Sequence, residues 1–152
     1  MNDRIKFLSL SELFRDISPK DLNGVFELLQ EETIPANTQV FHEDDISDAI
    51  FILKEGSVKI TLRAVWRMQK EDIITIIRPG EIFGEFSFID GARRSASAMA
   101  LDDITVFTLS RADFDVYAIK HPTVATTVMH NIAWLLTQKI RNTNMLYRSL
   151  KI

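Results

Sequence analysis

The central part of the chain alternates apolar and polar positions over short runs. In SVKITLR, residues 57–63, the alternation places Val58, Ile60 and Leu62 on one side of an extended segment. Similar runs, rich in β-branched or aromatic residues and separated by turn residues, occupy residues 38–42, 49–54, 72–78, 95–100 and 104–109. Short strands at this spacing predict a small antiparallel barrel or jelly roll over residues 31–109.

Helical patterns flank this β region on both sides. Ser18-Pro19-Lys20-Asp21 combines an N-cap serine, a proline at the first helical position and an acidic residue at the third, within a helical segment 1–30. Ser110-Arg111-Ala112-Asp113 opens a short helix, and Pro122 starts a long helix that runs to about Tyr147. The predicted fold class is therefore α+β, mainly β: an antiparallel β-roll with N-terminal helices and a long C-terminal helix.

The long C-terminal helix carries two apolar stripes. One has the spacing of a coiled-coil seam and consists of Met129, Ala133, Leu136, Ile140, Thr143, Tyr147 and Leu150. The neighbouring stripe, Val128, Ile132 and Leu135, can pack on the β-roll. The two stripes allow either a homodimer through this helix, which the heptad spacing favours, or a single broad core face.

Composition and charge exclude several classes of protein. The chain has 152 residues, no cysteine and a net charge of −3, which excludes a disulfide framework, thiolate metal sites and a global basic field for nucleic acid. Its apolar runs are far shorter than the roughly 20 residues that span a bilayer. The N-terminus lacks the features of a signal peptide. We expect a single cytoplasmic domain, residues 1–152, without membrane or direct nucleic-acid contact.

Three of the five glycines, Gly80, Gly84 and Gly91, fall within one short segment. This clustering indicates a local demand on the backbone, and the same segment carries the candidate chemistry. The run 83–90, FGEFSFID, predicts a turn at glycine and then one helical turn, whose unpaired backbone N–H groups suit an anion. Arg94 offers a planar fork for a phosphate, Ser95 a hydroxyl donor and Ala96 an accessible N–H. Glu85 beside an anion suggests an acceptor for a ligand hydroxyl, so the segment points to a nucleotide.

The run 83–100, FGEFSFIDGARRSASAMA, resembles the phosphate-binding cassette of cyclic nucleotide-binding domains, whose pattern is roughly F-G-E-L-(A/S/G)-L…R-(S/T/A)-A. The family includes bacterial catabolite activators, protein kinase A regulatory subunits and cyclic-nucleotide-gated channels. The resemblance covers nearly the whole chain. It implies N-terminal helices over 1–30, a β-roll over 31–109 with the cassette at 82–97, and C-terminal helices over 110–152.

The resemblance also implies roles for single residues. Glu85 accepts from the ribose 2′-hydroxyl, and Arg94 pairs with the cyclic phosphate in preference to Arg93. The implied ligand is cyclic AMP (cAMP) or cyclic GMP (cGMP), with no further cofactor and no metal. The implied ligand-binding residues are Ile60, Ile74, Thr75, Phe83, Gly84, Glu85, Phe86, Ser87, Arg94, Ser95 and Ala96.

The chain departs from the family at turns and on the closing helix. Asn37 and Asp44 stand where the family usually has glycine, but both residue types tolerate left-handed geometry. The positions where catabolite activators meet adenine fall on Lys139 and Ile140. Nearby alternatives are Thr137, Arg141, Asn142 and Thr143, and Trp134 can either cap a base or pack. The identity of the base stays open.

Rival functions are disfavoured by what the sequence lacks. A metal-dependent barrel enzyme needs clustered histidines, whereas His42, His121 and His130 are isolated in sequence. Nucleophile-elbow and Walker motifs are absent. We therefore expect no enzyme but a sensor domain in which a cyclic nucleotide moves the C-terminal helix toward a dimer or a downstream protein partner. The alternatives are the sensor fragment of a transcription regulator without its DNA-binding domain, and a ligand-independent interaction module.

Overall fold

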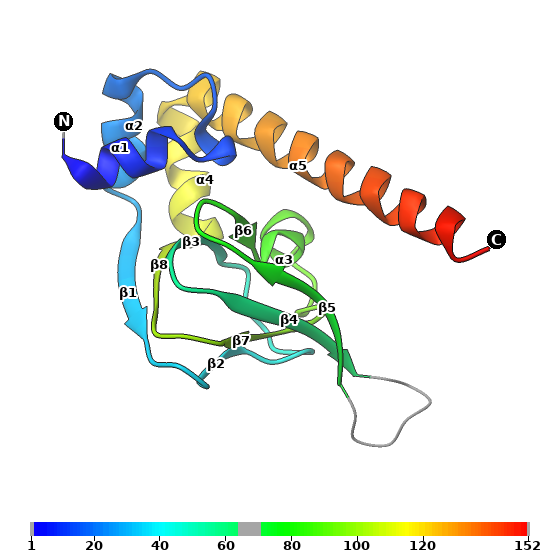
Figure 1. Ribbon diagram of the computed structural model, residues 1–152. Helices are drawn as coiled ribbons and strands as arrows, with labels where there is room; N and C mark the ends of the chain where they lie inside the picture. Colours follow the sequence, from blue (N-terminus) through cyan, green and yellow to red (C-terminus); the bar gives the residue numbers. More distant parts are fainter. Residues whose placement is uncertain (1, 64–70, 152) are drawn as a thin grey trace.

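Two antiparallel sheets form a β-roll within residues 2–63 and 71–151, which the computed structural model describes. One sheet has the strand order β1-β8-β3-β6 and the other the order β2-β7-β4-β5 (Figure 1). The strands are β1 (Gln30–Ile34), β2 (Gln39–Phe41), β3 (Ile50–Glu55), β4 (Val58–Arg63), β5 (Glu71–Ile77), β6 (Ile82–Phe83), β7 (Ser97–Ala100) and β8 (Ile104–Leu109).

Helices gather at one end of the roll and along one side of it (Figure 1). They are α1 (Asp3–Ser9), the 3₁₀ turn η1 (Glu12–Phe14), α2 (Pro19–Phe26), α3 (Glu85–Asp90), α4 (Arg111–Lys120) and α5 (Pro122–Ser149). The predicted caps are present, since the side chains of Ser18 and Ser110 accept from the backbone N–H groups of Asp21 and Asp113. The predicted fold class, a mainly β domain with flanking helices, is confirmed.

The six predicted strand runs all form strands, but two strands lie outside them. β1, with the sequence QEETI, has only Ile34 buried, so it lacks an apolar alternation, and it pairs along β8 at the edge of its sheet. β6 has two residues and pairs with Phe51 and Ile52 of β3. Both strands depend on their neighbours in the sheet, and no local sequence signal identifies them.

Two apolar clusters hold the fold together. The larger one joins the N-terminal helices, α4 and α5 to the first sheet around Leu13, Phe107 and Val128. The second fills the roll itself and includes Phe41, Phe51 and Phe83. The rings of Phe51 and Phe83 stack with centroids 4.9 Å apart. This aromatic stack stiffens the part of the roll from which Gly84 and α3 continue.

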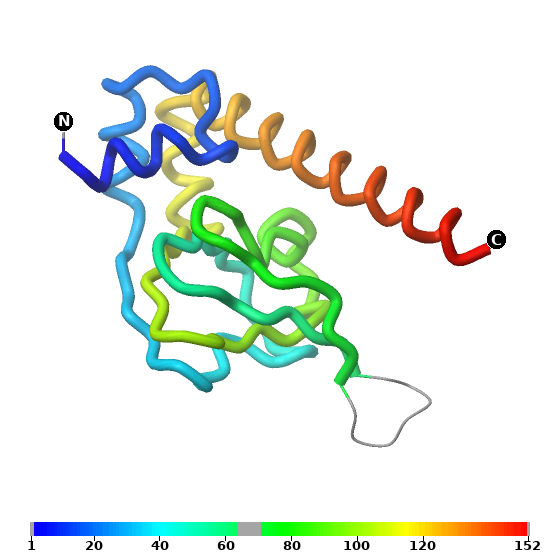
Figure 2. Tube along the Cα trace, viewed as in Figure 1, coloured from blue at the N-terminus to red at the C-terminus, as the bar shows by residue number. Residues whose placement is uncertain are grey.

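The buried residues of helix α5 all lie in its first half. Val128 and Ile132 are buried there, and the buried side chain of Asn131 donates hydrogen bonds to the carbonyl oxygens of Leu13 and Arg15 at 3.0 and 2.8 Å. Beyond Gln138 every described residue of the helix is exposed. The C-terminal turns accordingly project past the β-roll (Figure 2).

The two predicted stripes of α5 separate along the helix. Val128, Ile132 and Leu135 pack toward the core as predicted, and Met129 and Leu136 of the seam join them. The rest of the seam is different, because Ile140, Tyr147 and Leu150 are exposed. The broad core face is thus limited to the first half of the helix, and self-association through the second half stays a prediction.

Candidate functional site

A cavity of about 740 Å³ lies between β4, β5, α3 and the C-terminal half of α5. Its walls are mainly apolar, with Leu62, Ile77 and Leu135 among them. All eleven residues predicted to bind a ligand line this one cavity: Ile60, Ile74, Thr75, Phe83, Gly84, Glu85, Phe86, Ser87, Arg94, Ser95 and Ala96. Their contacts with a ligand stay predictions. The structure brings together, in one place, residues from four separate segments of the chain.

The turn at Gly84 places Glu85 at the cavity. Gly84 adopts a left-handed conformation, φ 75°, as the N-cap of α3, and this reverses the chain after the buried strand β6. Glu85 follows in the first helical turn with its side chain almost wholly buried. The first turn of any helix leaves backbone N–H groups that the helix itself does not pair. The cassette therefore offers backbone donors and one buried acceptor side by side.

Arg94 is the buried cation of the site. Its guanidinium donates to the carbonyl oxygens of Gly84 at 2.9 Å and Ala49 at 2.7 Å, and to the hydroxyl of Ser47 at 3.0 Å. The guanidinium carbon lies 4.3 Å from the centre of the Phe41 ring. Within the described part of the chain its Nε is buried and has no hydrogen-bond partner. The guanidinium thus links its own segment to those of Gly84 and of Ser47 and Ala49, while its buried Nε–H is left without an acceptor in the described part of the chain.

Burial dominates the electrostatics of Arg94. It lowers the pKa of the guanidinium from its ordinary value, while the carboxylates of Asp48, Asp45 and Glu85 raise that pKa and oppose the shift. An arginine stays protonated under such a shift, because its ordinary pKa is far above neutrality. The site therefore contains a permanent positive charge with little solvent around it, which favours an anionic ligand.

Arg94 lines the cavity and Arg93 does not. The N–H of Asp44 donates to the carbonyl oxygen of Arg94 at 2.8 Å, and the N–H of Arg94 donates to that of Asp45 at 2.9 Å. These bonds direct the Arg94 side chain inward. Arg93 is exposed, donates to the carbonyl oxygen of Asp44 at 3.0 Å, and is not among the residues that line the cavity.

The two turns in which Asn37 and Asp44 replace the family's usual glycine keep the left-handed geometry that was predicted for them. Asn37 has φ 61° and Asp44 has φ 71°, both in the left-handed region. Asp44 stands in the turn that holds Arg94, so its conformation bears directly on the site. The side chain of Asp45 accepts from the N–H of His42 at 2.8 Å and steadies the same turn.

Lys139 makes a contact at the cavity that the sequence did not indicate. Its ammonium donates to Oε1 of Glu85, forming an ion pair between α5 and α3. The Lys139 side chain is 44% exposed and that of Glu85 only 6%. The two residues are 54 positions apart, so no local pattern couples them.

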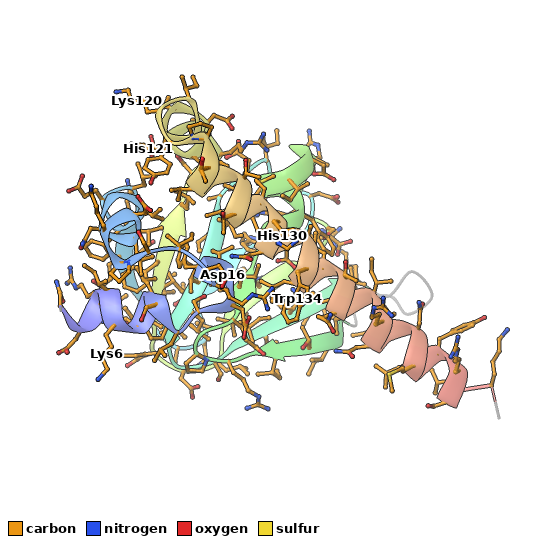
Figure 3. The ribbon with its side chains drawn as sticks, turned by 90° about the horizontal axis from the view of Figure 1, so that it is seen from above. Lys6, Asp16, Lys120, His121, His130 and Trp134 are labelled. Carbon is orange, nitrogen blue, oxygen red and sulfur yellow. The ribbon has the colours of Figure 1, made fainter. Side chains whose placement is uncertain are left out.

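The structure narrows the choice of residues on the closing helix. Lys139, Asn142 and Thr143 line the cavity, together with Gln138, which the sequence did not single out. Thr137, Ile140 and Arg141 do not line it, because they lie on other faces of the helix. Trp134 does not line it either; its ring lies under the guanidinium of Arg15, 4.4 Å away. Figure 3, viewed from above, shows Trp134 on α5 near the Asp16 segment.

The isolated histidines do not assemble into a metal centre. Over residues 2–63 and 71–151, no group of three or more histidine or carboxylate side chains is placed to hold a metal ion. His121 stacks on Tyr117 instead, with ring centroids 4.4 Å apart. In the same described ranges, no helix combines the length and the apolar character needed to cross a membrane.

Comparison with known proteins identifies the family. The sequence profile described as "Cyclic nucleotide-binding domain" matches residues 13–121, more than half of the chain. The chain therefore belongs to the cyclic nucleotide-binding domain family.

Relatives and solved structures of this family match over most of the chain. The Cyclic AMP receptor protein of Thermus thermophilus is 28% identical over 135 residues, which cover 89% of this chain and 60% of that relative. The crystal structure of a cyclic nucleotide-binding domain from Methylobacillus flagellatus is 25% identical, with a TM-score of 0.82, over 91% of this chain and 76% of that one. The regulatory domain of Toxoplasma gondii PKA, crystallised with cAMP, is 27% identical, with a TM-score of 0.65, over 74% and 42%.

Proposed function

We propose that the cavity binds a purine 3′,5′-cyclic nucleotide, cAMP or cGMP, and that the domain is a sensor without catalytic activity. The observation that carries the proposal is that buried Glu85 and buried Arg94 both line the same mainly apolar cavity. A cyclic nucleotide combines a hydroxyl, an anionic phosphate and a flat apolar base. The site offers a counterpart to each of these groups: an acceptor for the hydroxyl, a buried cation for the phosphate and apolar walls for the base.

The size and the donors of the site support this ligand. The cavity volume of about 740 Å³ falls within the range of roughly 300–1,000 Å³ that is typical of small-molecule sites. The phosphate lies against Arg94 Nε, the Ser95 hydroxyl and the backbone N–H of Ala96. The ribose 2′-hydroxyl donates to Glu85. The base packs among Ile60, Ile74 and Thr75, with Asn142 and Thr143 of α5 as polar neighbours.

The proposed output is a change in the position of α5. This helix supplies one wall of the cavity while its C-terminal turns are exposed. A ligand that binds one placement of α5 more tightly shifts the population toward that placement. When α5 moves, its exposed seam around Ile140 and Tyr147 moves with it, and this alters the contacts of the seam with a second copy of the chain or with a downstream protein partner.

The role of the whole protein is a separate proposal. The chain spans 60% of the length of the Thermus thermophilus Cyclic AMP receptor protein. It spans 59% of a CRP-like cAMP-activated global transcriptional regulator of Mycobacterium tuberculosis, to which it is 25% identical. These matches favour, as the second candidate, the sensor part of a transcription regulator.

Isothermal titration calorimetry with cAMP and with cGMP tests the proposed function. We expect saturable binding of at least one of them, one nucleotide per chain, with the nucleotide recovered intact by chromatography. Heat from neither titration contradicts the proposal and puts a ligand-independent interaction module first. Recovery of a hydrolysed nucleotide contradicts the absence of catalysis.

A further inference from the structure

The ion pair between Lys139 and Glu85 crosses from the closing helix to the cassette. Glu85 is a buried carboxylate, and burying a charge is costly unless a partner compensates it. Lys139 supplies that partner from a stretch of α5 that is otherwise exposed. Both side chains line the cavity, so the pair stands at the site rather than beside it.

Lys139 is also the last polar tie between α5 and the rest of the fold. In the described part of the chain, hydrogen bonds and ion pairs from α5 side chains to other elements come from Asn131 and Lys139 alone. Asn131 holds the first half of the helix. Lys139 lies two helical turns further on, where the apolar packing against the core has ended.

The charge of the site depends on this lysine. Two cations, Arg94 and Lys139, and three carboxylates, Glu12, Glu81 and Glu85, line the cavity, and Lys139 is the cation that is paired with Glu85. An ammonium has three N–H donors and a carboxylate has two oxygens. With Oε1 of Glu85 bound to Lys139, Oε2 is the oxygen left for a ligand hydroxyl. The ion pair and a bound ligand can therefore coexist.

We propose that Lys139 is a positioning residue of the ligand site. It compensates the charge of Glu85 and draws α5 over the cavity, so one ion pair sets both the affinity for an anionic ligand and the placement of the helix. The part of this proposal that concerns ligand affinity rests on the proposed function. The part that concerns the placement of α5 does not depend on any ligand.

The first test compares nucleotide affinity among charge variants, using cAMP and cGMP as probes. We expect Lys139→Met to weaken binding about three- to tenfold and Lys139→Arg to stay within about twofold of the unmodified chain. Arg141→Met is the matched control, because it removes the same charge from an exposed position two residues away that does not line the cavity. In a Glu85→Gln background, Lys139→Met should have little further effect, since the partner charge is gone.

The second test needs no nucleotide. The chain has no cysteine, so cysteines introduced at the exposed positions Ala92 and Asn144 can carry the only two spin labels. Double electron–electron resonance should give one narrow distance distribution for the otherwise unmodified chain and for Lys139→Arg. It should give a broader or displaced distribution for Lys139→Met.

The two tests separate failure of this proposal from failure of the proposed function. An unchanged label distance in Lys139→Met overturns the proposal, and so does tighter nucleotide binding by that variant. If the unmodified chain binds neither nucleotide, the proposed function fails. The distance measurement then decides alone whether Lys139 holds α5.

Discussion

Nη1 of Arg94 donates to the carbonyl oxygen of Gly84 at 2.9 Å, and a Cβ added to Gly84 would lie 2.8 Å from that same nitrogen. Glycine at position 84 therefore serves two needs at once. It adopts φ 75°, and it leaves room for the guanidinium that crosses behind it. The carbonyl oxygen of Ala49 would lie 3.1 Å from this added Cβ, and a backbone atom cannot move away from it as easily as a flexible side chain can.

Gly84→Ala should lower both the free energy of unfolding and the affinity for nucleotide. Left-handed geometry at a non-glycine residue costs about 1–2 kcal/mol, and displacement of Arg94 adds to this. Gly91→Ala is the matched control, because Gly91 has φ 69° but nothing within 4 Å of an added Cβ. Urea denaturation should show the larger loss for Gly84→Ala, and calorimetry should show weaker binding for that variant alone. Equal losses in the two variants would mean that Arg94 adapts freely.

Arg94 and Arg93 should differ sharply when each is replaced. Arg94→Ala leaves the partly buried carbonyl groups of Gly84 and Ala49 without their donor, so we expect about 2–4 kcal/mol less stability. For the folded fraction we expect a loss of about 2–5 kcal/mol in nucleotide affinity. Arg93→Ala removes an exposed side chain and should change stability by no more than about 0.5 kcal/mol.

Calorimetry and urea denaturation on both arginine variants check this difference. Circular dichroism at the titration temperature establishes the folded fraction of Arg94→Ala before affinity is compared. Normal binding by folded Arg94→Ala, with Arg93→Ala inactive, would show that Arg93 is the phosphate residue.

Glu85→Ala should change which sugar the site prefers. Loss of a hydrogen bond to a charged acceptor costs about 1.5–3 kcal/mol, so cAMP should bind correspondingly more weakly. Its 2′-deoxy analogue lacks the hydroxyl that Glu85 accepts, and should bind the variant and the unmodified chain with more similar affinity. Competition titrations with the two nucleotides give this comparison. A preference for ribose that survives in Glu85→Ala would place the 2′-hydroxyl elsewhere.

The fold could be predicted largely from local patterns in the sequence, and the lining of the cavity from the family resemblance. The cap at Ser18, the alternation in 57–63 and the glycine spacing around Gly84 each reflect a backbone demand that acts within a few residues. β1 and β6 could not be predicted in this way, because they are polar or very short and form through pairing with β8 and β3.

The side-chain partners within the site depend on tertiary geometry instead. The sequence predicted Arg94 as a phosphate ligand, but not its donation to Ser47 and Ala49 in the loop before β3. The contact of Lys139 with Glu85 depends on the angle at which α5 leaves the core, and this angle follows from packing around Val128 and Ile132. No pattern in the sequence encodes that angle directly.

Asn131 should be important for stability despite its polar side chain. Its amide donates to the carbonyl oxygens of Leu13 and Arg15, and it is buried. Asn131→Ala leaves both acceptors unpaired, so we expect a loss of about 1–3 kcal/mol. Asn144→Ala makes the same substitution at an exposed position of the same helix and should be nearly neutral. Urea denaturation of the two variants provides the measurement, and similar midpoints would mean that water replaces the Asn131 amide.

The exposed seam of α5 should mediate self-association. Ile140 is 62% exposed and stands in the heptad register with Tyr147, beyond the part of the helix that packs on its own core. A charge at such a position in a helix–helix interface must be buried without a partner, so Ile140→Asp should weaken a dimer at least about tenfold. Ile119→Asp is the control, because Ile119 is 82% exposed on α4, outside the seam. Sedimentation velocity over a range of concentrations should show dimers for the unmodified chain and for Ile119→Asp, and monomers for Ile140→Asp. Monomers for all three chains would instead favour a seam that covers only the domain's own core.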